Sequence, residues 1–410
     1  MTAAGGAGAT DNAFGSPDNP LPFQPPRRAD VFLLGQLRLG AQFEKPRTIF
    51  RATYLLDSRI SLRVGNEAFT NGGTMQLTRR LAEDKTLAFS AGAVLTQLQT
   101  FSAATSPSLE SQRPFIPPPT NQQLLGGTFA QEYEGGLTDQ WVLRQSTRGA
   151  IIYLLPSDGR GQSSGLPANL PPLITAEQSV GPVWVASPKH QFFFEGRALY
   201  LYSADFVRFQ AHHILAQGPI ITWTYKFARD LFTELQGGFL VATELTHEGN
   251  AIDGIGGASV GYDDTFSTAV LYARRVIRPA LFTAEFITTN ELGVRGTLQN
   301  DARTLHADLG AGVRLSRDLV QGQNGSDRDY RTFFVGSELG WAPAEFFSVV
   351  LRYEYARQEI DVPGPVADFS RNLVLGMLTG TLGTKPRKEI EEKDPNARPA
   401  VQSTQPPPVF

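Results

Sequence analysis

Polar and apolar residues alternate along most of this chain, from Val31 to about Leu382. In the first such segment Leu33 and Leu37 fall on one parity and Gln36 falls on the other. Successive side chains of a β-strand point to opposite faces, so the pattern predicts strands with one apolar and one polar face. It recurs about eighteen times without helical periodicity between the repeats, which predicts an all-β fold with one large closed sheet.

The two ends of the chain differ from its middle in composition. Residues 1–29 are rich in Gly, Ala and Pro, and residues 384–410 combine charged residues with prolines. Neither segment has strand periodicity, so we expect a flexible N-terminal arm and a disordered C-terminal tail. No composition shift divides residues 30–383, which we assign to a single barrel domain.

Short and long connections are expected to alternate along this domain. Residues 56–59 and 187–189 have turn composition, whereas the links at 102–125 and 155–175 are long. A count of 16 strands stays open, because residues 47–69 could form either a pair of strands or one long strand. The expected strands lie near residues 31–43, 47–56, 60–69, 74–81, 86–101, 126–137, 139–153, 176–187, 190–203, 206–227, 231–246, 251–262, 265–277, 281–298, 302–317, 330–341, 346–360 and 370–382.

The apolar face of such a sheet must be shielded from water, either by other protein or by lipid. No apolar run reaches the ~18 residues of a membrane helix, but barrel strands carry a much weaker hydropathy signal. Aromatic residues gather near strand ends, for example Trp141, Tyr153 and Trp341, which is typical of membrane-interface girdles. We therefore expect a single closed antiparallel transmembrane β-barrel, apolar outside and polar inside. A soluble all-β protein with the opposite orientation is the alternative.

In these features the chain resembles bacterial outer-membrane β-barrel proteins of the porin kind, over residues 31–382. The resemblance concerns architecture alone, because no short motif identifies a subfamily. It implies a bacterial outer-membrane location and a lipid bilayer as partner, and both chain ends on the short-turn rim. Residues 1–5 lack the basic start and apolar core of a signal peptide, so we expect an export leader that was removed. Such barrels commonly close on an aromatic residue, whereas the last strand here runs through Leu373, Leu375 and Met377.

The polar parity carries many charged residues, which we expect to line a water-filled lumen. Four arginines are expected on four consecutive strands, and neighbouring strands lie about 4.8 Å apart. Together they would form a basic ladder along one wall, which favours the entry of anions into the lumen. The alternative is that these charges only solvate the lumen and pair across strands. The ladder comprises Arg38, Arg51, Arg63 and Arg80. The further lining residues are Glu132, Glu134, Arg144, Arg148, Glu195, Arg197, Arg208, Glu234, Glu285, Arg295, Asp308, Arg314, Glu338, Arg352 and Glu354.

The predicted function is passage of a polar solute through this lumen, without catalysis. A net charge of −3 offers no general attraction to nucleic acid, and without cysteines there are no thiolate metal sites. His212 and His213 point to opposite faces, and no histidine pair has metal spacing, so no metal or cofactor is expected.

Three alternatives stay open. The barrel could be a dedicated conduit that exports polysaccharide or lipid with a periplasmic partner bound through the tails. It could be a hydrolase in which Ser348 approaches His306 and Asp308. It could also be a plugged structural or adhesive barrel.

Overall fold

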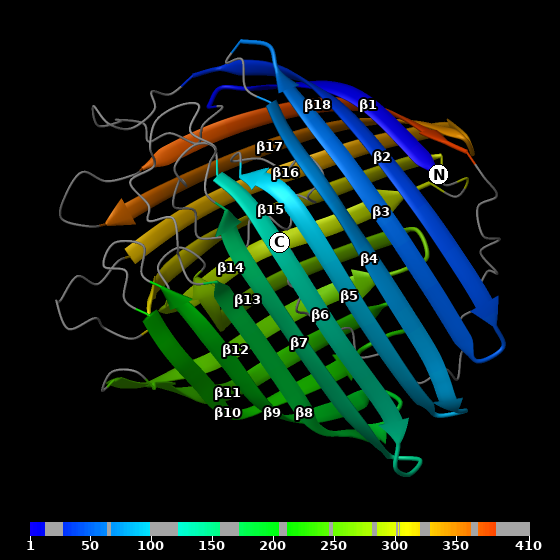
Figure 1. Ribbon diagram of the computed structural model, residues 1–410. Helices are drawn as coiled ribbons and strands as arrows, with labels where there is room; N and C mark the ends of the chain where they lie inside the picture. The colour runs from blue at the N-terminus through cyan, green and yellow to red at the C-terminus, as the bar shows by residue number, and fades with distance from the viewer. Residues whose placement is uncertain are drawn as a thin grey trace.

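The computed structural model forms one antiparallel sheet of 18 strands over its described residues. Each strand pairs with the next in sequence, and β1 pairs with β18, so the sheet closes into a barrel (Figure 1). Among the described residues we find no helix with the length and apolar character needed to cross a membrane. The structure describes residues 1–12, 28–63, 67–98, 122–155, 172–204, 211–245, 249–280, 285–300, 302, 304–319, 329–361 and 368–382.

The strands are 9 to 16 residues long, as expected for strands that cross a bilayer at a tilt. They are β1 (Thr2–Thr10), β2 (Asp30–Lys45), β3 (Thr48–Ser61), β4 (Glu67–Ala82), β5 (Lys85–Leu98), β6 (Gln122–Gly136), β7 (Trp141–Leu155), β8 (Leu173–Ser187), β9 (His190–Ala204), β10 (Ala211–Lys226), β11 (Leu231–Glu244), β12 (Gly249–Asp263), β13 (Ser267–Ala280), β14 (Glu285–Gln299), β15 (Leu305–Asp318), β16 (Asp329–Ala344), β17 (Phe347–Asp361) and β18 (Phe369–Thr381).

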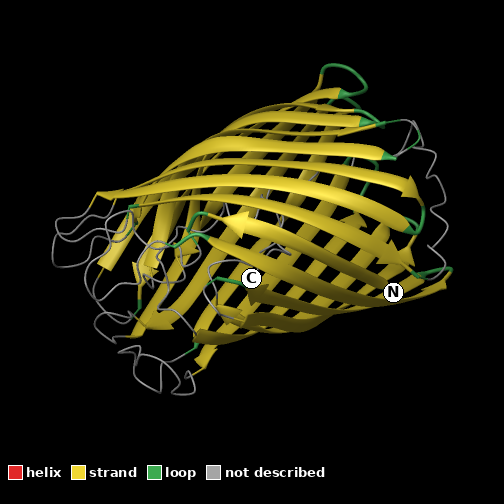
Figure 2. Cartoon of the chain, turned by 90° about the horizontal axis from the view of Figure 1, so that it is seen from above, coloured by secondary structure: helices red, strands yellow, loops and turns green. Residues whose placement is uncertain are grey.

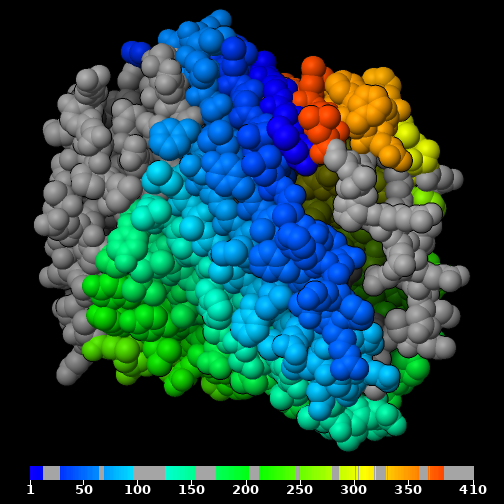
Figure 3. All heavy atoms as spheres, turned by 45° about the vertical axis from the view of Figure 1, so that its right-hand side comes forward, coloured from blue at the N-terminus to red at the C-terminus, as the bar shows by residue number. Residues whose placement is uncertain are grey.

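The first strand corrects the expected N-terminal arm. Residues 2–10 form β1, in which Gly8 pairs with Phe32 of β2 on one side and Leu375 of β18 on the other. Figure 3 shows this segment, in dark blue, on the barrel surface beside the orange-red residues of β18. Sequence reasoning missed it because Gly and Ala have low strand propensity and no alternation. Here small residues are needed, since a Cβ at Gly8 would lie 2.5 Å from the Phe32 ring.

A second correction concerns residues 30–82, where three strands replace the four expected. The predicted turn at 56–59 lies inside β3, and the expected strands at 47–81 become β3 and β4. The count of eighteen is right because the missed β1 compensates for this extra strand. Asp57 and Arg59 have turn-like composition, but both are buried side chains on the inner face of β3.

The two rims differ as predicted where the structure describes them. Two residues join β2 to β3 and β4 to β5, and Figure 2 shows the short turns at the end where the N-terminus lies. The Met1 amino group donates to the Leu382 carbonyl at 2.9 Å, so both ends of the barrel domain lie on this short-turn rim. Most of the links at 102–125 and 155–175, and the tail from 384 to 410, fall outside the described residues.

A contact across the barrel identifies the inner face of the sheet. Phe286 of β14 shares a buried cluster with Leu201 of β9 and Ile214 of β10, strands that are far apart around the wall. Leu201 and Ile214 therefore lie on the inner face, and alternation and strand register extend this assignment to the other strands; Phe286 reaches the cluster from the end of β14, where residues of both parities are buried. All large hydrophobic side chains that are exposed on strands lie on the opposite, outward face, for example Met75 and Leu309. The barrel is therefore apolar outside, and the predicted orientation is confirmed.

Aromatic side chains form a row on this outward face near the short-turn rim. Trp141 of β7 stacks on Trp184 of β8 at 6.0 Å between ring centroids, and Trp184 stacks on Phe192 of β9 at 5.5 Å. The row continues through Trp223 and Tyr225 of β10, at 6.4 Å from Phe192 to Trp223. Amphipathic rings at one level around a barrel are the expected form of an interfacial girdle.

A smaller aromatic group lies on the same face near the other rim. Tyr202 of β9 packs against His213 of β10 at 4.6 Å, and the Tyr200 hydroxyl lies 3.0 Å from the His213 Nδ1. Phe192 and Tyr202 lie ten positions apart on β9. They span about 33 Å of strand, or about 25 Å of height at a tilt of about 40°, which is the height of the apolar band in membrane barrels.

Candidate functional site: the lumen

One part of the wall is a single layer with space on both sides. On β4, Met75 is 57% exposed on the outward face, and its neighbours Thr74 and Gln76 are exposed on the inner face. Arg38 of β2 and Arg51 of β3 are also exposed on the inner face. Inner side chains that reach solvent show that the barrel is hollow along β2 to β6, which we call the open wall.

Paired charges border the open wall on β6 and β7. The Glu134 carboxylate accepts from Arg144 at 2.8 Å, and the Glu132 carboxylate accepts from Arg148 at 2.9 Å. The two carboxylates remain 51% and 57% exposed, whereas the arginines are largely covered. Each pair is an ordinary cross-strand contact, yet it leaves negative oxygen atoms directed at the lumen.

The opposite part of the lumen is filled with apolar side chains. Most of these side chains belong to the inner faces of β7 to β12, and two come from the ends of β13 and β14. Most are almost fully buried. The cluster comprises Ile152, Leu173, Leu199, Leu201, Ile214, Ala216, Ile220, Leu240, Ala242, Ile255, Ile277 and Phe286. A water-filled lumen would leave such residues solvated, so this half of the barrel is a packed core.

The core exists because the paired ends of β13 and β14 separate from β12 and bend into the barrel, while β14 stays paired with β15. β13 pairs with β12 only from Thr268 to Arg275, although β13 extends to Ala280. Beyond this point side chains of both parities are buried, including Phe286 and Ile287 with at most 1% exposure. A strand buried on both faces lies inside the barrel. We call residues 276–280 and 285–289 the inward segment.

Polar contacts fasten the inward segment to the strand that it leaves. The Arg275 guanidinium donates to the Asp253 carboxylate of β12 at 2.5 Å and to the Gly254 carbonyl at 3.0 Å. The Thr288 hydroxyl donates to the same carboxylate. Arg275 therefore satisfies a backbone carbonyl at the point where the β12–β13 ladder ends, which matters because an unpaired backbone group at membrane depth is costly.

A buried charge cluster lies at the base of the inward segment. The Glu291 carboxylate of β14 is 1% exposed and accepts from Arg274 at 2.9 Å, Arg314 at 3.2 Å and Arg278 at 3.4 Å. The Tyr272 hydroxyl also donates to it, at 2.9 Å. One carboxylate thus joins β13 to β15 through three guanidinium groups. Glu291 falls on the polar parity of its strand, but only the fold shows that it is shared.

The expected arginine ladder does not form one row. Arg63 lies beyond the end of β3, where its amide donates to Asp30, and Arg80 lies at the opposite rim, bound to the Glu83 carbonyl at 2.9 Å. Arg38 and Arg51 share the open wall, but Arg51 is opposite Gln42, four residues along β2 from Arg38. The ladder was wrong for two reasons: parity does not fix height, as Arg38 and Arg51 show, and the turn assigned at 56–59 misplaced Arg63 and Arg80.

The remaining predicted lining residues divide by burial. Glu195 and Arg197 pair at 2.7 Å in the filled half, and Arg352 pairs with Glu354, all four largely buried. Glu234, Arg295, Asp308 and Glu338 have inner parity at intermediate to high exposure. Arg208 and the side chain of Glu285 lie outside the described residues. Residues that sequence reasoning missed are Arg59, Glu177, Arg274, Arg278 and Phe286.

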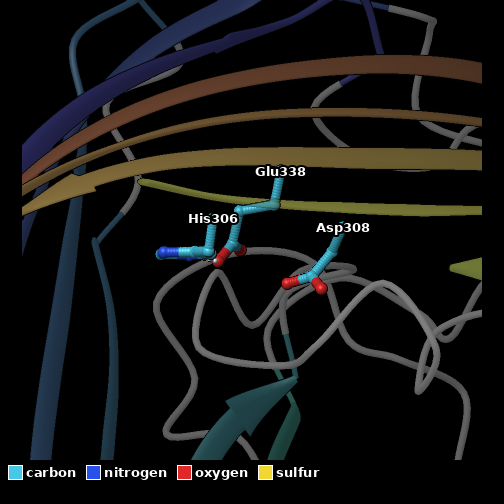
Figure 4. Close-up of side chains that lie close together, drawn as sticks. All are labelled: His306, Asp308 and Glu338. Carbon is cyan, nitrogen blue, oxygen red and sulfur yellow. Dashed lines mark hydrogen bonds and ion pairs between the residues drawn. The ribbon is translucent and has the colours of Figure 1, made fainter. Parts of the chain in front are cut away.

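The hydrolase alternative required a serine beside His306. The structure instead places the His306 Nε2 3.4 Å from the Glu338 carboxylate, with Asp308 nearby (Figure 4). Within the described residues we find no hydrogen bond between Ser348 and the imidazole, so a hydrogen-bonded serine–histidine pair is not assembled here.

Comparisons with known proteins concern the fold alone. No family model matches the sequence, and no curated protein matches it. The OccK2 structure of Pseudomonas aeruginosa in complex with glucuronate is 10% identical, with a TM-score of 0.47 over 93% of this chain and 97% of that one. The siderophore receptor PirA of Acinetobacter baumannii is 8% identical, with a TM-score of 0.46 over 93% and 80%. The FrpB iron transporter of Neisseria meningitidis is 7% identical, with a TM-score of 0.49 over 92% and 82%.

Proposed function

We propose that this chain is a pore of the bacterial outer membrane that passes polar solutes along the open wall. The observation that carries the proposal is the exposure of β4 on both faces, with Met75 outside and Gln76 inside. A barrel of this strand number has room for an aqueous channel, and inner side chains that reach solvent indicate that some of this room is water-filled.

The solute path in this proposal is narrower than a whole barrel of 18 strands, because the packed core occupies the lumen beside β7 to β14. Solutes would pass the carboxylates of Glu132 and Glu134, whose exposed oxygen atoms attract cations. The exposed arginines Arg38 and Arg51 lie on the same wall. Because charges of both signs line this wall, we expect it to admit small hydrophilic solutes without a strong preference for cations or for anions.

Planar-bilayer conductance of the purified full chain tests the proposal. We expect stable single-channel steps, and we expect the double variant Glu132→Gln, Glu134→Gln to shift ion selectivity toward anions. Glu359→Gln is the matched control, since Glu359 also pairs with an arginine, Arg357 at 2.7 Å, but lies on the outward face. A protein that inserts into the bilayer and conducts no ions would contradict the pore and favour a plugged barrel.

Conductance also separates the pore from an export conduit. A simple pore conducts without any other protein and keeps its conductance when residues 384–410 are deleted. A conduit that depends on a periplasmic partner at this tail would lose transport on that deletion while its barrel still inserts.

A further inference from the structure

We propose that His306, Asp308 and Glu338 form a binding site for a divalent transition-metal ion on the lumen wall. The ligand atoms of the three side chains all lie within 4.8 Å of one another. Figure 4 shows the three side chains on the same side of neighbouring strands, directed into the barrel. The site goes beyond the proposed passage of solutes and does not depend on it.

The register of two strands brings these side chains together. His306 and Asp308 are two residues apart on β15, so they share the inner face. Glu338 of β16 is the direct register partner of Asp308. Directly opposed side chains of an antiparallel pair are the closest that a sheet offers, and their β-carbons lie about 5 Å apart.

A glycine sets the position of the imidazole. Gly340 is the register partner of His306, and a Cβ at position 340 would lie 1.8 Å from the His306 Cε1. The ring therefore occupies the space that a side chain at position 340 would take, with its Nε2 3.4 Å from the Glu338 Oε1. Two ligand atoms that each bind zinc at about 2.1 Å with a tetrahedral angle are about 3.4 Å apart, so this pair already has the required separation.

The charge of the site favours a cation. Most lumen carboxylates pair with arginine, as Glu132 and Glu134 do. Among the described residues, neither Asp308 nor Glu338 forms an ion pair with arginine or lysine. Arg352, the register partner of Glu338 on β17, pairs with Glu354. Two adjacent carboxylates that lack a guanidinium repel each other, and a bound cation relieves this repulsion.

The ligand set identifies the class of ion. One imidazole nitrogen and two carboxylate oxygens suit zinc and neighbouring transition ions, whereas Mg²⁺ and Ca²⁺ prefer oxygen ligands alone. The His306 and Glu338 side chains are 33% and 24% exposed, so an ion can reach them from lumen water. With three protein ligands the ion would keep a position for water, and it would bind reversibly from solution.

Titration calorimetry of the purified full chain with ZnCl₂ tests the site. We expect one Zn²⁺ per chain, and at least tenfold weaker binding in each of His306→Asn, Asp308→Asn and Glu338→Gln. His212→Asn is the matched control, because His212 also faces the lumen and contacts a carboxylate, Glu244 at 2.7 Å, but among the described residues these two do not belong to a group of three metal-binding side chains. Its affinity should equal that of the wild type.

A second measurement separates a defined site from loose association. Co²⁺ bound by the three side chains should give visible absorption bands that Zn²⁺ displaces and that His306→Asn removes. Heat-modifiable migration on a gel shows whether each variant still folds as a barrel. Wild-type protein that binds no Zn²⁺ overturns the proposal, as does equal binding by the wild type and a folded His306→Asn variant. Neither result bears on conductance, so the pore proposal is tested separately.

Discussion

Shortening one phenylalanine should loosen the inward segment and widen the lumen. Phe286 is fully buried and packs against inner-face residues of β7 to β12, including Leu201 and Ile214. Its backbone carbonyl accepts from the Leu319 amide at 2.8 Å, an interaction that alanine would keep. Phe286→Ala therefore removes side-chain packing and leaves the hydrogen bonds of β14 in place.

The size of the effect follows from the burial. Truncating a fully buried phenylalanine to alanine costs about 3–5 kcal/mol in a packed core. Each 1.4 kcal/mol corresponds to about a tenfold change in an equilibrium constant, so a displaced inward segment becomes roughly 10²–10⁴ times more populated. The contacts of Asp253 and Glu291 oppose this displacement, and we therefore expect brief openings to a larger conductance rather than a permanently wider pore.

Single-channel recording of Phe286→Ala in planar bilayers measures this directly. We expect additional steps of higher conductance that the wild type rarely shows. The control is Phe239→Ala, the same substitution at a side chain that is 47% exposed on the outward face of β11. If Phe286→Ala and wild type give the same conductance distribution while Phe286→Ala remains folded, the inward segment does not limit the lumen.

Three further predictions test other contacts. Glu291→Gln removes the shared carboxylate of Arg274, Arg278 and Arg314 and should lower the free energy of unfolding by about 3–5 kcal/mol in urea titrations followed by tryptophan fluorescence. Glu359→Gln, at an exposed pair, should change it by no more than about 1 kcal/mol, and equal effects would contradict the role of burial. Gly340→Ala should displace the His306 ring and weaken Zn²⁺ binding as His306→Asn does, whereas Gly310→Ala, whose Cβ would meet nothing within 4 Å, should leave the affinity unchanged. All 4 tryptophans lie on the outward face near the short-turn rim, so brominated lipids should quench their fluorescence most strongly when the bromine is near the headgroup; strongest quenching from the acyl-chain end would contradict this placement.

Several features of the fold could be predicted from local pattern. Alternation assigned Leu309 and Leu351 to the lipid face and Asp308 and Arg352 to the lumen face, because side-chain direction follows from parity alone. Apart from residues 56–59, which lie inside β3, turn residues identified the short connections, and the aromatic residues at strand ends identified the girdle. β1 was missed, because its glycines and alanines show no polar–apolar alternation. Only its pairing with β2 and β18 in the structure identifies it as a strand.

The candidate site was less predictable, because it depends on register. Arg38 and Arg51 have the predicted parity but different heights, because the β2–β3 register places Arg51 opposite Gln42. The turn wrongly assigned at 56–59 misplaced Arg63 and Arg80. The same reasoning explains the metal-binding proposal. Parity put His306 and Asp308 on one face, whereas the approach of Glu338 required the β15–β16 register and a glycine at position 340.

The amino-acid sequence by itself determined a closed, two-faced sheet with its apolar side toward lipid, since each strand encodes its two faces independently of the others. Tertiary structure decided how the lumen is occupied. Leu199 and Leu201 fall on the inner parity and look misplaced in a water-filled barrel, and only the inward segment with Phe286 explains their burial. A side chain's face is a property of one strand, but its neighbours across the lumen are set by how all the strands close and bend together.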